Sequence, residues 1–242
     1  MSEHAGAKRD RLDKIAAVYD PSNPDVEFDY YFKRLQAAAL RPWLRGRQIL
    51  ELGCATGELS SLLSPWSDSY SVVEGSQRNI DAARARVPTA TFVHSLWEDF
   101  EPERPFTDVV ACNALEHVSD PVQLLRRAGR WLEPGGRFHA VVPNGLSLHR
   151  LVGVEMGMLY DALELADGDL AQGHVRNYTI ESLRSDIATG GFEVAHAQGI
   201  FLKVVSNRQM LGWDWNLIQA IDRVARRFPE HGAELYVVGE RP

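Results

Sequence analysis

Two glycines and two glutamates in the first third of the chain have the types and spacing needed to hold a nucleoside. Gly53 and Gly57 enclose a loop that directly follows a short apolar run containing Glu51, and glycines there let the backbone approach a ligand closely. Glu74 ends the next apolar run, where its carboxylate can accept hydrogen bonds from ribose hydroxyls. The pattern predicts a site for a nucleoside-bearing cofactor.

The spacing of the glycines argues against other nucleotide sites. The loop reads Gly-x-x-x-Gly and lacks the Gly-x-Gly-x-x-Gly spacing that brings a helix N-terminus against a pyrophosphate. No Gly-Lys-Ser/Thr occurs, so a triphosphate-binding loop is not indicated. An NAD-type oxidoreductase shares the glycine loop and the acidic residue and stays an alternative, although no Tyr-x-x-x-Lys group for hydride transfer is present.

A second group of polar residues follows a later apolar run. Asn113, Glu116 and His117 come after residues 107–112, and histidine titrates near neutral pH. His117 is therefore the first candidate for orienting an acceptor or removing its proton, and His174 is the second. The alternative is that His117 only closes a hydrogen bond within its own loop.

Short apolar runs that alternate with helical patterns would position these residues. Each run ends in a turn or capping residue and is followed by apolar residues at helical spacing. Such alternation implies right-handed βαβ units and a mainly parallel sheet, whose ligands bind beyond the carboxyl ends of the strands. The predicted strands cover 48–52, 70–74, 91–94, 107–113, 137–142, 191–197 and 234–238. Helices are predicted to begin at 58, at 77 with Ser76 as the cap, and at 121 with the turn at 134–136 as the end, and a helical segment covers 211–228.

Four motifs between residues 48 and 142, ELGCATGEL, VVEGS, DVVACNALEHVSDP and LEPGGRF, resemble in order and spacing those of class I S-adenosylmethionine-dependent methyltransferases. The resemblance implies S-adenosylmethionine as cofactor and an α/β fold: a Rossmann-like, doubly wound, seven-stranded, mostly parallel sheet with an antiparallel edge strand and helical acceptor-side insertions. It implies that Glu51, Gly53 and Gly57 shape the pocket for the methionine part and that Glu74 holds the ribose. The other cofactor-binding residues that it implies are Cys54, Ala55, Gly75, Ser95, Leu96, Trp97 and Asn113.

The adenine loop departs from the family's pattern. Many members carry an aspartate after the third strand that contacts the adenine amine, whereas this chain reads HSLW at 94–97. Backbone groups of Ser95 and Leu96 and the ring of Trp97 would then line the adenine.

A possible metal site departs from the pattern as well. Some relatives, the ubiquinone-type O-methyltransferases among them, have a divalent-metal site that would correspond here to Asn113, Glu116, His117 and His174. Asn113 replaces the first carboxylate, and the loss of an anionic ligand weakens a hard-cation site. We therefore predict no bound metal.

The segment 143–198 is longer than a strand-to-helix connection needs. It resembles the acceptor-side insertion of small-molecule members and is predicted to form a lid over an acceptor pocket, with Tyr30, Tyr31 and Phe32 covering the pocket from the other side. The alternative is a structural helical layer on the sheet. Trp213 and Trp215 suit a pocket or a homodimer surface equally. The candidate acceptor-binding residues are Tyr30, Tyr31, Glu116, His149 and Tyr178.

Composition argues against several other classes of protein. The 242 residues carry a net charge of −7 with no Lys/Arg run longer than a pair, so a nucleic-acid partner is not expected. No window has the apolar length of a membrane helix and the charged beginning lacks a signal-peptide core, so neither membrane insertion nor export is expected. Cys54 and Cys112 lie far apart without metal-ligand spacing, which fits a reducing cytoplasm.

These observations predict one methyltransferase domain over residues 1–242. It would comprise an N-terminal helical cover (1–46), a cofactor-binding half (47–142) and an acceptor-side half with the lid and the last strands (143–242). The predicted reaction is in-line transfer of a methyl group to an oxygen or nitrogen of a small molecule such as a natural product or other secondary metabolite. The alternatives are the NAD-type oxidoreductase and a non-catalytic, cofactor-binding partner subunit.

Overall fold

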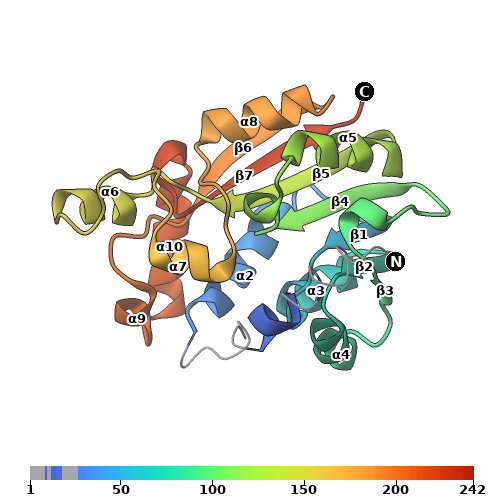
Figure 1. Cartoon of the computed structure of the whole chain (residues 1–242), viewed down its shortest axis with the longest axis horizontal. Helices are drawn as coiled ribbons and strands as arrows, with labels where there is room; N and C mark the ends of the chain where they lie inside the picture. Colours follow the sequence, from blue (N-terminus) through green and yellow to red (C-terminus); the bar gives the residue numbers. More distant parts are fainter. Residues whose placement is uncertain (1–8, 10–11, 18–26) are drawn as a thin grey trace.

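A computed structural model describes residues 9, 12–17 and 27–242, so part of the predicted N-terminal cover lies outside the described residues. One seven-stranded sheet forms the centre of the molecule, and helices cover both of its faces (Figure 1). The strands are β1 (Gln48–Leu52), β2 (Ser69–Glu74), β3 (Thr91–His94), β4 (Phe106–Cys112), β5 (Leu132–Pro143), β6 (Glu193–Ile200) and β7 (Glu234–Glu240).

The strand order is β3-β2-β1-β4-β5-β7-β6. The first five strands pair in parallel, whereas β7 runs antiparallel to both β5 and β6. The edge strand β6 is thus antiparallel to its neighbour β7. The strand that runs against the parallel strands is β7, which lies between β5 and β6. The predicted fold class, a mostly parallel, doubly wound sheet, is confirmed.

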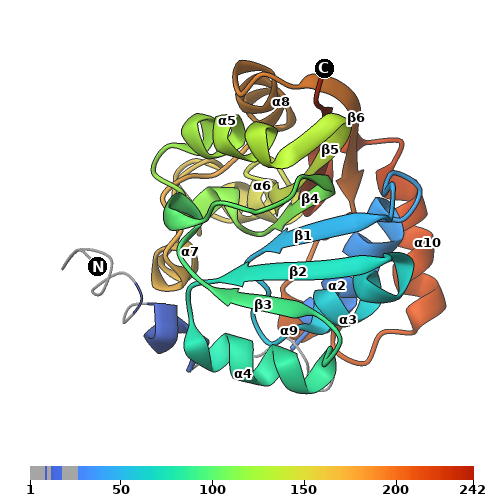
Figure 2. The same ribbon diagram turned by 90° about the vertical axis from the view of Figure 1, so that its right-hand side faces the viewer.

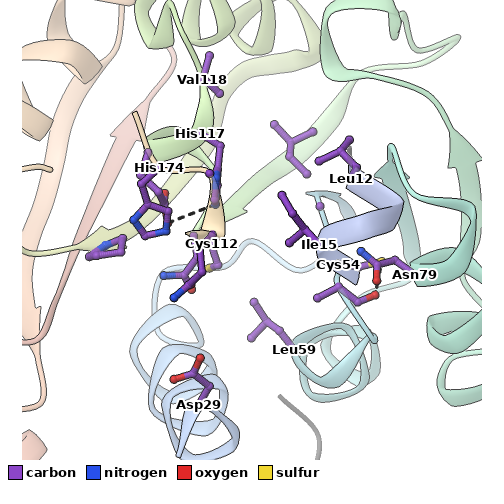
Figure 3. Close-up of a pocket in the computed structure, with 18 of the residues that line it drawn as sticks. Leu12, Ile15, Asp29, Cys54, Leu59, Asn79, Cys112, His117, Val118 and His174 are labelled. Carbon is purple, nitrogen blue, oxygen red and sulfur yellow. Dashed lines mark hydrogen bonds and ion pairs between the residues drawn. The ribbon is translucent and has the colours of Figure 1, made fainter. Parts of the chain in front are cut away.

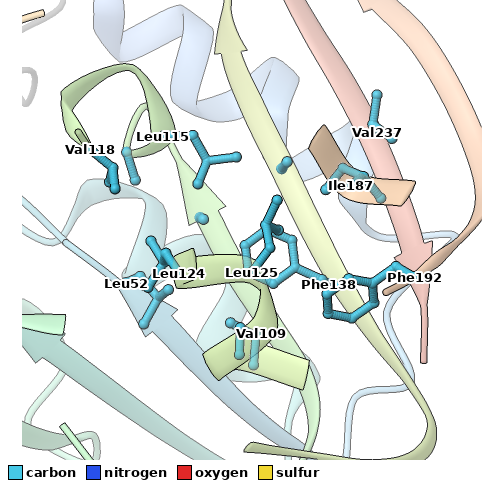
Figure 4. Packing of buried hydrophobic residues seen from close by; sticks show 14 of the residues in the cluster. Leu52, Val109, Leu115, Val118, Leu124, Leu125, Phe138, Ile187, Phe192 and Val237 are labelled. Atoms are coloured by element: carbon cyan, nitrogen blue, oxygen red, sulfur yellow. The ribbon is translucent and has the colours of Figure 1, made fainter. Parts of the chain in front are cut away.

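The central strands are buried and largely apolar because both faces of the sheet are covered. Every residue of β4 is buried, with Val109 and Ala111 in one core cluster and Val110 and Cys112 in the other. This alternation follows from the two-residue period of a strand. Figure 4 shows the first cluster, where Phe138 lies beside Phe192 with ring centroids 5.7 Å apart.

Different helices cover the two faces of the sheet (Figure 2). Helices α5 and α8 pack on the first cluster, whereas α2, α3 and α10 pack on the second. The helices are α2 (Asp29–Leu40), α3 (Glu58–Leu63), α4 (Gln77–Arg86), α5 (Pro121–Trp131), α6 (Leu148–Glu155), α7 (Asp167–Gln172), α8 (Ile180–Thr189), α9 (Asn207–Met210) and α10 (Trp215–Ala225), with short 3-10 turns at Ser64–Trp66, Trp97–Asp99, Leu115–His117 and Pro229–His231.

Local capping explains where two predicted helices begin. The Ser76 hydroxyl accepts a hydrogen bond from the amide of Asn79 at 3.2 Å, and the Asp120 carboxylate accepts one from the amide of Gln123 at 2.9 Å. The predicted end of α5 at the 134–136 turn was wrong. The helix ends at Trp131 because β5 begins at Leu132, which pairs with Phe106 of β4.

The segment between β5 and α8 contains α6 and α7, which project from the carboxyl end of the sheet (Figure 1). The predicted helical segment over 211–228 is α10, preceded by the single-turn helix α9. None of the described helices is long and apolar enough to cross a membrane.

Candidate functional site

A cavity of about 420 Å³ opens at the carboxyl ends of the parallel strands. Loops after β1, β2 and β3 form one wall, and the loop after β4, α2, the α6–α7 segment and the start of β7 form the other. Figure 3 shows His117 and His174 on one side of this cavity and Leu12, Ile15 and Cys54 on the opposite side. Ligands of parallel α/β sheets bind at this edge.

The glycine loop after β1 has the left-handed backbone that its glycines favour. The φ angles are +77° at Gly53 and +83° at Gly57, and Gly53, Cys54 and Ala55 line the cavity. Gly57, predicted to bind the cofactor, does not line it. It precedes α3, and a Cβ there would lie 2.8 Å from the Cα of Ala83 on α4, so its role is close packing behind the loop.

Glu74 lies at the end of β2 and faces the cavity. Its Oε1 accepts a hydrogen bond from the Ser76 amide at 2.8 Å, and its Oε2 accepts one from the Cys54 amide at 3.1 Å. The side chain is buried, and burial raises its pKa. Two amides thus fix the carboxylate while its remaining lone pairs stay available to paired hydroxyls. Gly75 lines the cavity beside it.

Glu51 lines the floor of the cavity and is 1% exposed. Its Oε2 accepts hydrogen bonds from the Ser60 hydroxyl and, at 3.0 Å, from the Tyr70 hydroxyl. Burial raises the pKa of Glu51 to about 7. The carboxyl group therefore ties β1 to α3 and β2 beneath the glycine loop.

The loop after β3 forms the end of the cavity nearest Leu12 and Ile15, and Ser95, Leu96 and Trp97 all line it. The Ser95 amide donates to the carbonyl of Glu74 at 3.1 Å, which joins this loop to the end of β2.

Two polar residues that the motifs did not single out also line this end, Asn79 on α4 and Glu98 directly after Trp97. Glu98 could have been predicted from the sequence, because it brings a carboxylate into a loop that lacks the family's usual aspartate.

A cluster of proton-binding groups faces the cavity beyond β4. One ligand atom each of Glu116, His117 and His174 lies within 4.8 Å of the others, and the two rings meet edge to face at 4.8 Å between centroids. Glu116 is 1% exposed, its oxygens have no hydrogen-bond partner among the described residues, and burial raises its pKa to about 8. Burial lowers the pKa of His174, whose Nδ1 lies 3.7 Å from Asp169 Oδ1.

One carboxylate and two imidazoles are a donor set that can hold a divalent transition-metal ion. The side chain of Asn113, the fourth residue of the possible metal set, is held by three other residues. Its Oδ1 accepts hydrogen bonds from Lys33 Nζ at 2.9 Å and Gln36 Nε2 at 2.8 Å, and its Nδ2 donates to Glu234 at 3.1 Å. The absence of a metal stays a prediction.

The predicted acceptor-binding residues divide into two groups. Glu116 and His149 line the cavity, and burial lowers the pKa of His149 to about 3. Tyr30, Tyr31 and Tyr178 do not line it. Tyr31 stacks on Trp215 with ring centroids 5.8 Å apart, and Arg34 lies over the Tyr30 ring. Tyr178 is 2% exposed in the core, where its hydroxyl donates to Asp186 at 3.2 Å.

The helix period explains the misplacement of the tyrosines. Asp29, Phe32 and Lys33 of α2 line the cavity because residues three and four apart share a helix face, which leaves Tyr30 and Tyr31 pointing elsewhere. Phe32, also predicted to cover the site, does so. Five further polar lining residues were missed and carry no local signal in the sequence: Asp169, Gln172, Lys203, Asn207 and Glu234.

Comparison with known proteins assigns the class. Residues 26–197 match the sequence model of a family described as "Methyltransferase domain", and the chain belongs to this family. It is 27% identical over 179 residues to a protein of Mycolicibacterium smegmatis named "Probable S-adenosylmethionine-dependent methyltransferase", covering 73% of this chain and 64% of that one. It is 32% identical over 137 residues to a ubiquinone biosynthesis O-methyltransferase of Xanthomonas campestris pv. campestris strain B100, covering 52% and 57% respectively.

A solved structure shows the same fold. The N-methyltransferase NodS from Bradyrhizobium japonicum WM9, in complex with S-adenosyl-L-homocysteine, aligns with a TM-score of 0.59 at 15% identity and covers 99% of this chain and 100% of its own. The chain spans about three fifths of the two curated relatives. The class I methyltransferase family predicted from the four motifs is confirmed, and with it S-adenosylmethionine as the cofactor of the class.

Proposed function

We propose that this protein transfers a methyl group from S-adenosylmethionine to an oxygen or nitrogen of a small molecule. The observation that carries the proposal is that two different groups of residues line the same cavity. At one end lie the glycine loop and Glu74, and at the other lie Glu116, His117 and His174. A cofactor held by the first wall would present its methyl group toward the second.

The chain's own groups have separate tasks in this reaction. The bound cofactor supplies an electrophilic methyl group, so the protein mainly aligns an acceptor lone pair with it. Glu74 and the loop amides bind the cofactor. His174, which burial keeps neutral near pH 7, accepts a hydrogen bond from the acceptor and takes its proton if the acceptor is a hydroxyl. His117, whose side chain is 33% exposed, completes the same wall.

A small metabolite is the acceptor class that the cavity favours. The α6–α7 segment forms part of the wall opposite the glycine loop, to which it contributes His149, Asp169 and His174. The net charge of −7 disfavours a nucleic-acid acceptor. One relative is an O-methyltransferase of ubiquinone biosynthesis and one structural neighbour is an N-methyltransferase, so both acceptor atoms remain within the proposal. A secondary metabolite and a reducing cytoplasm stay predictions.

The first test is calorimetric titration with S-adenosylhomocysteine and, in parallel, NAD. We expect micromolar or tighter binding of the former and none of the latter, and the reverse result would favour the oxidoreductase. Radiolabelled methyl transfer to panels of hydroxyl and amine metabolites then separates an enzyme from a non-catalytic subunit. His117→Ala and His174→Ala should each lower turnover roughly 100-fold with cofactor affinity kept. Full activity in both variants would leave alignment alone as the mechanism.

A further inference from the structure

The exposed apolar side chains are confined to two segments. Among the described residues, eleven large apolar side chains are exposed, and all lie within residues 152–175 or 204–228. Three consecutive ones are extreme, with Met156 at 68%, Met158 at 72% and Tyr160 at 95% exposure. Single exposed apolar residues are ordinary on a monomer, but confinement to two segments indicates contact surfaces. The others are Val152, Leu163, Leu170 and Val175 in the first segment and Val204, Leu217, Val224 and Phe228 in the second.

The second segment exposes a regular stripe on α10. Leu217 and Val224 are seven residues apart and therefore lie on one face of α10, with the half-buried Ile221 between them, and the exposed Phe228 follows just after the helix ends at Ala225. A neighbouring face of α10 already packs on the core through Ile218. A helix that is apolar on a second, solvent-facing side has an unpartnered surface.

The two surfaces carry opposite charge. The exposed charged residues of the first segment are all acidic, Glu155, Asp161 and Asp167, and residues 152–175 contain no lysine or arginine. The exposed charged residues of the second segment are one acid, Asp214, and four bases, Arg208, Arg223, Arg226 and Arg227. Each surface is therefore complementary to the other in charge as well as apolar character, and neither is complementary to itself.

We propose that a second copy of this chain covers both surfaces. The α6–α7 surface (152–175) of each protomer packs on the α10 surface (204–228) of the other, and a two-fold axis makes the contact twice. Figure 1 places α6 and α10 toward the same end of the molecule, and Figure 2 shows α10 at the opposite side of the view from α7, so the partner would have to contact both this end and the side that carries α10. A stable interface takes about 20 to 30 residues from each side, which two segments of this length supply.

The contact reaches the functional site through the first segment. Asp169 and His174, which line the cavity, belong to the segment that the second copy would cover from outside. On the proposed function, association therefore holds one wall of the acceptor pocket in place. The second copy would support the methyl-transfer site without contributing to cofactor binding.

Sedimentation equilibrium of the purified protein at low salt tests the contact without any acceptor. We expect a dimer of the 27.1 kDa chain. Met158→Asp with Tyr160→Asp, and separately Arg223→Glu with Arg227→Glu, should each weaken association at least about 10-fold. These side chains are exposed, so circular dichroism and S-adenosylhomocysteine affinity should stay unchanged. Arg78→Glu, an exposed arginine on α4, is the matched control and should leave association intact.

Rescue by the reversed pair identifies the partner surface. Asp161→Arg with Asp167→Arg should weaken association alone and restore it when combined with Arg223→Glu and Arg227→Glu. A wild-type monomer at every concentration, or a dimer indifferent to both sets of variants, would overturn the proposal. A dimer disrupted by these variants in a protein that transfers no methyl group would leave the interface standing and overturn only the proposed function.

Discussion

The two halves of the cavity are built from different kinds of local structure. In residues 47–142, most lining residues lie within a few positions of a strand end, at 53–55, 74–75, 95–98 and 112–118. In residues 143–242, most lie on helices or in the loops between them, as His149, His174, Lys203 and Asn207 do. Strand ends are visible in a sequence as apolar runs followed by turn residues, whereas the facing of an inserted helix depends on what it packs against.

Replacement of Gly57 by alanine should have the largest effect, because it breaks the framework of the cofactor half. The φ angle of +83° and the 2.8 Å approach of a Cβ to Ala83 strain the backbone and push α3 from α4. We expect urea denaturation to show a loss of about 2 to 5 kcal/mol in the free energy of unfolding. Gly191→Ala, at φ +97° with open space around the added Cβ, is the matched control and should lose about 1 to 2 kcal/mol. Equal losses would mean that the approach to α4 is unimportant.

Glu51 should make stability fall as the pH rises. Burial raises its pKa from 4.5 to about 7, so the folded state binds a proton more tightly than the unfolded state. The stabilisation is complete below pH 4.5 and is lost as the pH rises through 7, a change of about 3 kcal/mol for the full shift. Glu51→Gln should flatten this part of the pH profile of unfolding. A profile identical to that of the unmodified protein would show that the group titrates normally.

Substitutions at Glu74 and Glu116, in the two opposite walls of the cavity, should affect cofactor binding and turnover separately. Glu74→Ala removes a charged hydrogen-bond acceptor from the ribose side, and we expect the dissociation constant of S-adenosylhomocysteine to rise about 10- to 100-fold. Glu116→Gln, equally buried at the other end, should leave that constant unchanged and lower turnover. Titration calorimetry and initial rates measure the two effects. Unaltered cofactor binding in Glu74→Ala would remove the ribose assignment.

The smallest expected effects compare two positions on α2. Lys33 lines the cavity and donates a hydrogen bond to Asn113, so Lys33→Met should raise the KM for the acceptor several-fold, which corresponds to about 1 kcal/mol. Tyr30 lies off the cavity, and Tyr30→Phe should change KM less than about two-fold. Steady-state kinetics decide between the two positions, and an effect confined to Tyr30→Phe would return that residue to the acceptor site.

Much of the framework was predictable because its signals are local. The bounds of β1 and β3 were predicted to the residue, and Ser76 was identified as the cap of α4. Strand β5 was predicted to begin at Arg137 but begins at Leu132, because pairing of Leu132 with Phe106 extends the strand through a turn-like Pro-Gly-Gly. That pairing is a contact between distant residues and leaves no trace in the local pattern.

The sequence by itself determined the parallel sheet, the family and the strand-end loops after β1, β2 and β3 that line the cavity, since each depends on a strand and the turn that follows it. Only the tertiary structure decided which face of α2 meets the cavity, that Gly57 packs behind the loop, and that Tyr178 lies in the core. It also brought His174 to His117 across 57 positions of chain. The physical reason is that periodicity specifies which residues share a face, while packing against distant segments specifies what that face contacts.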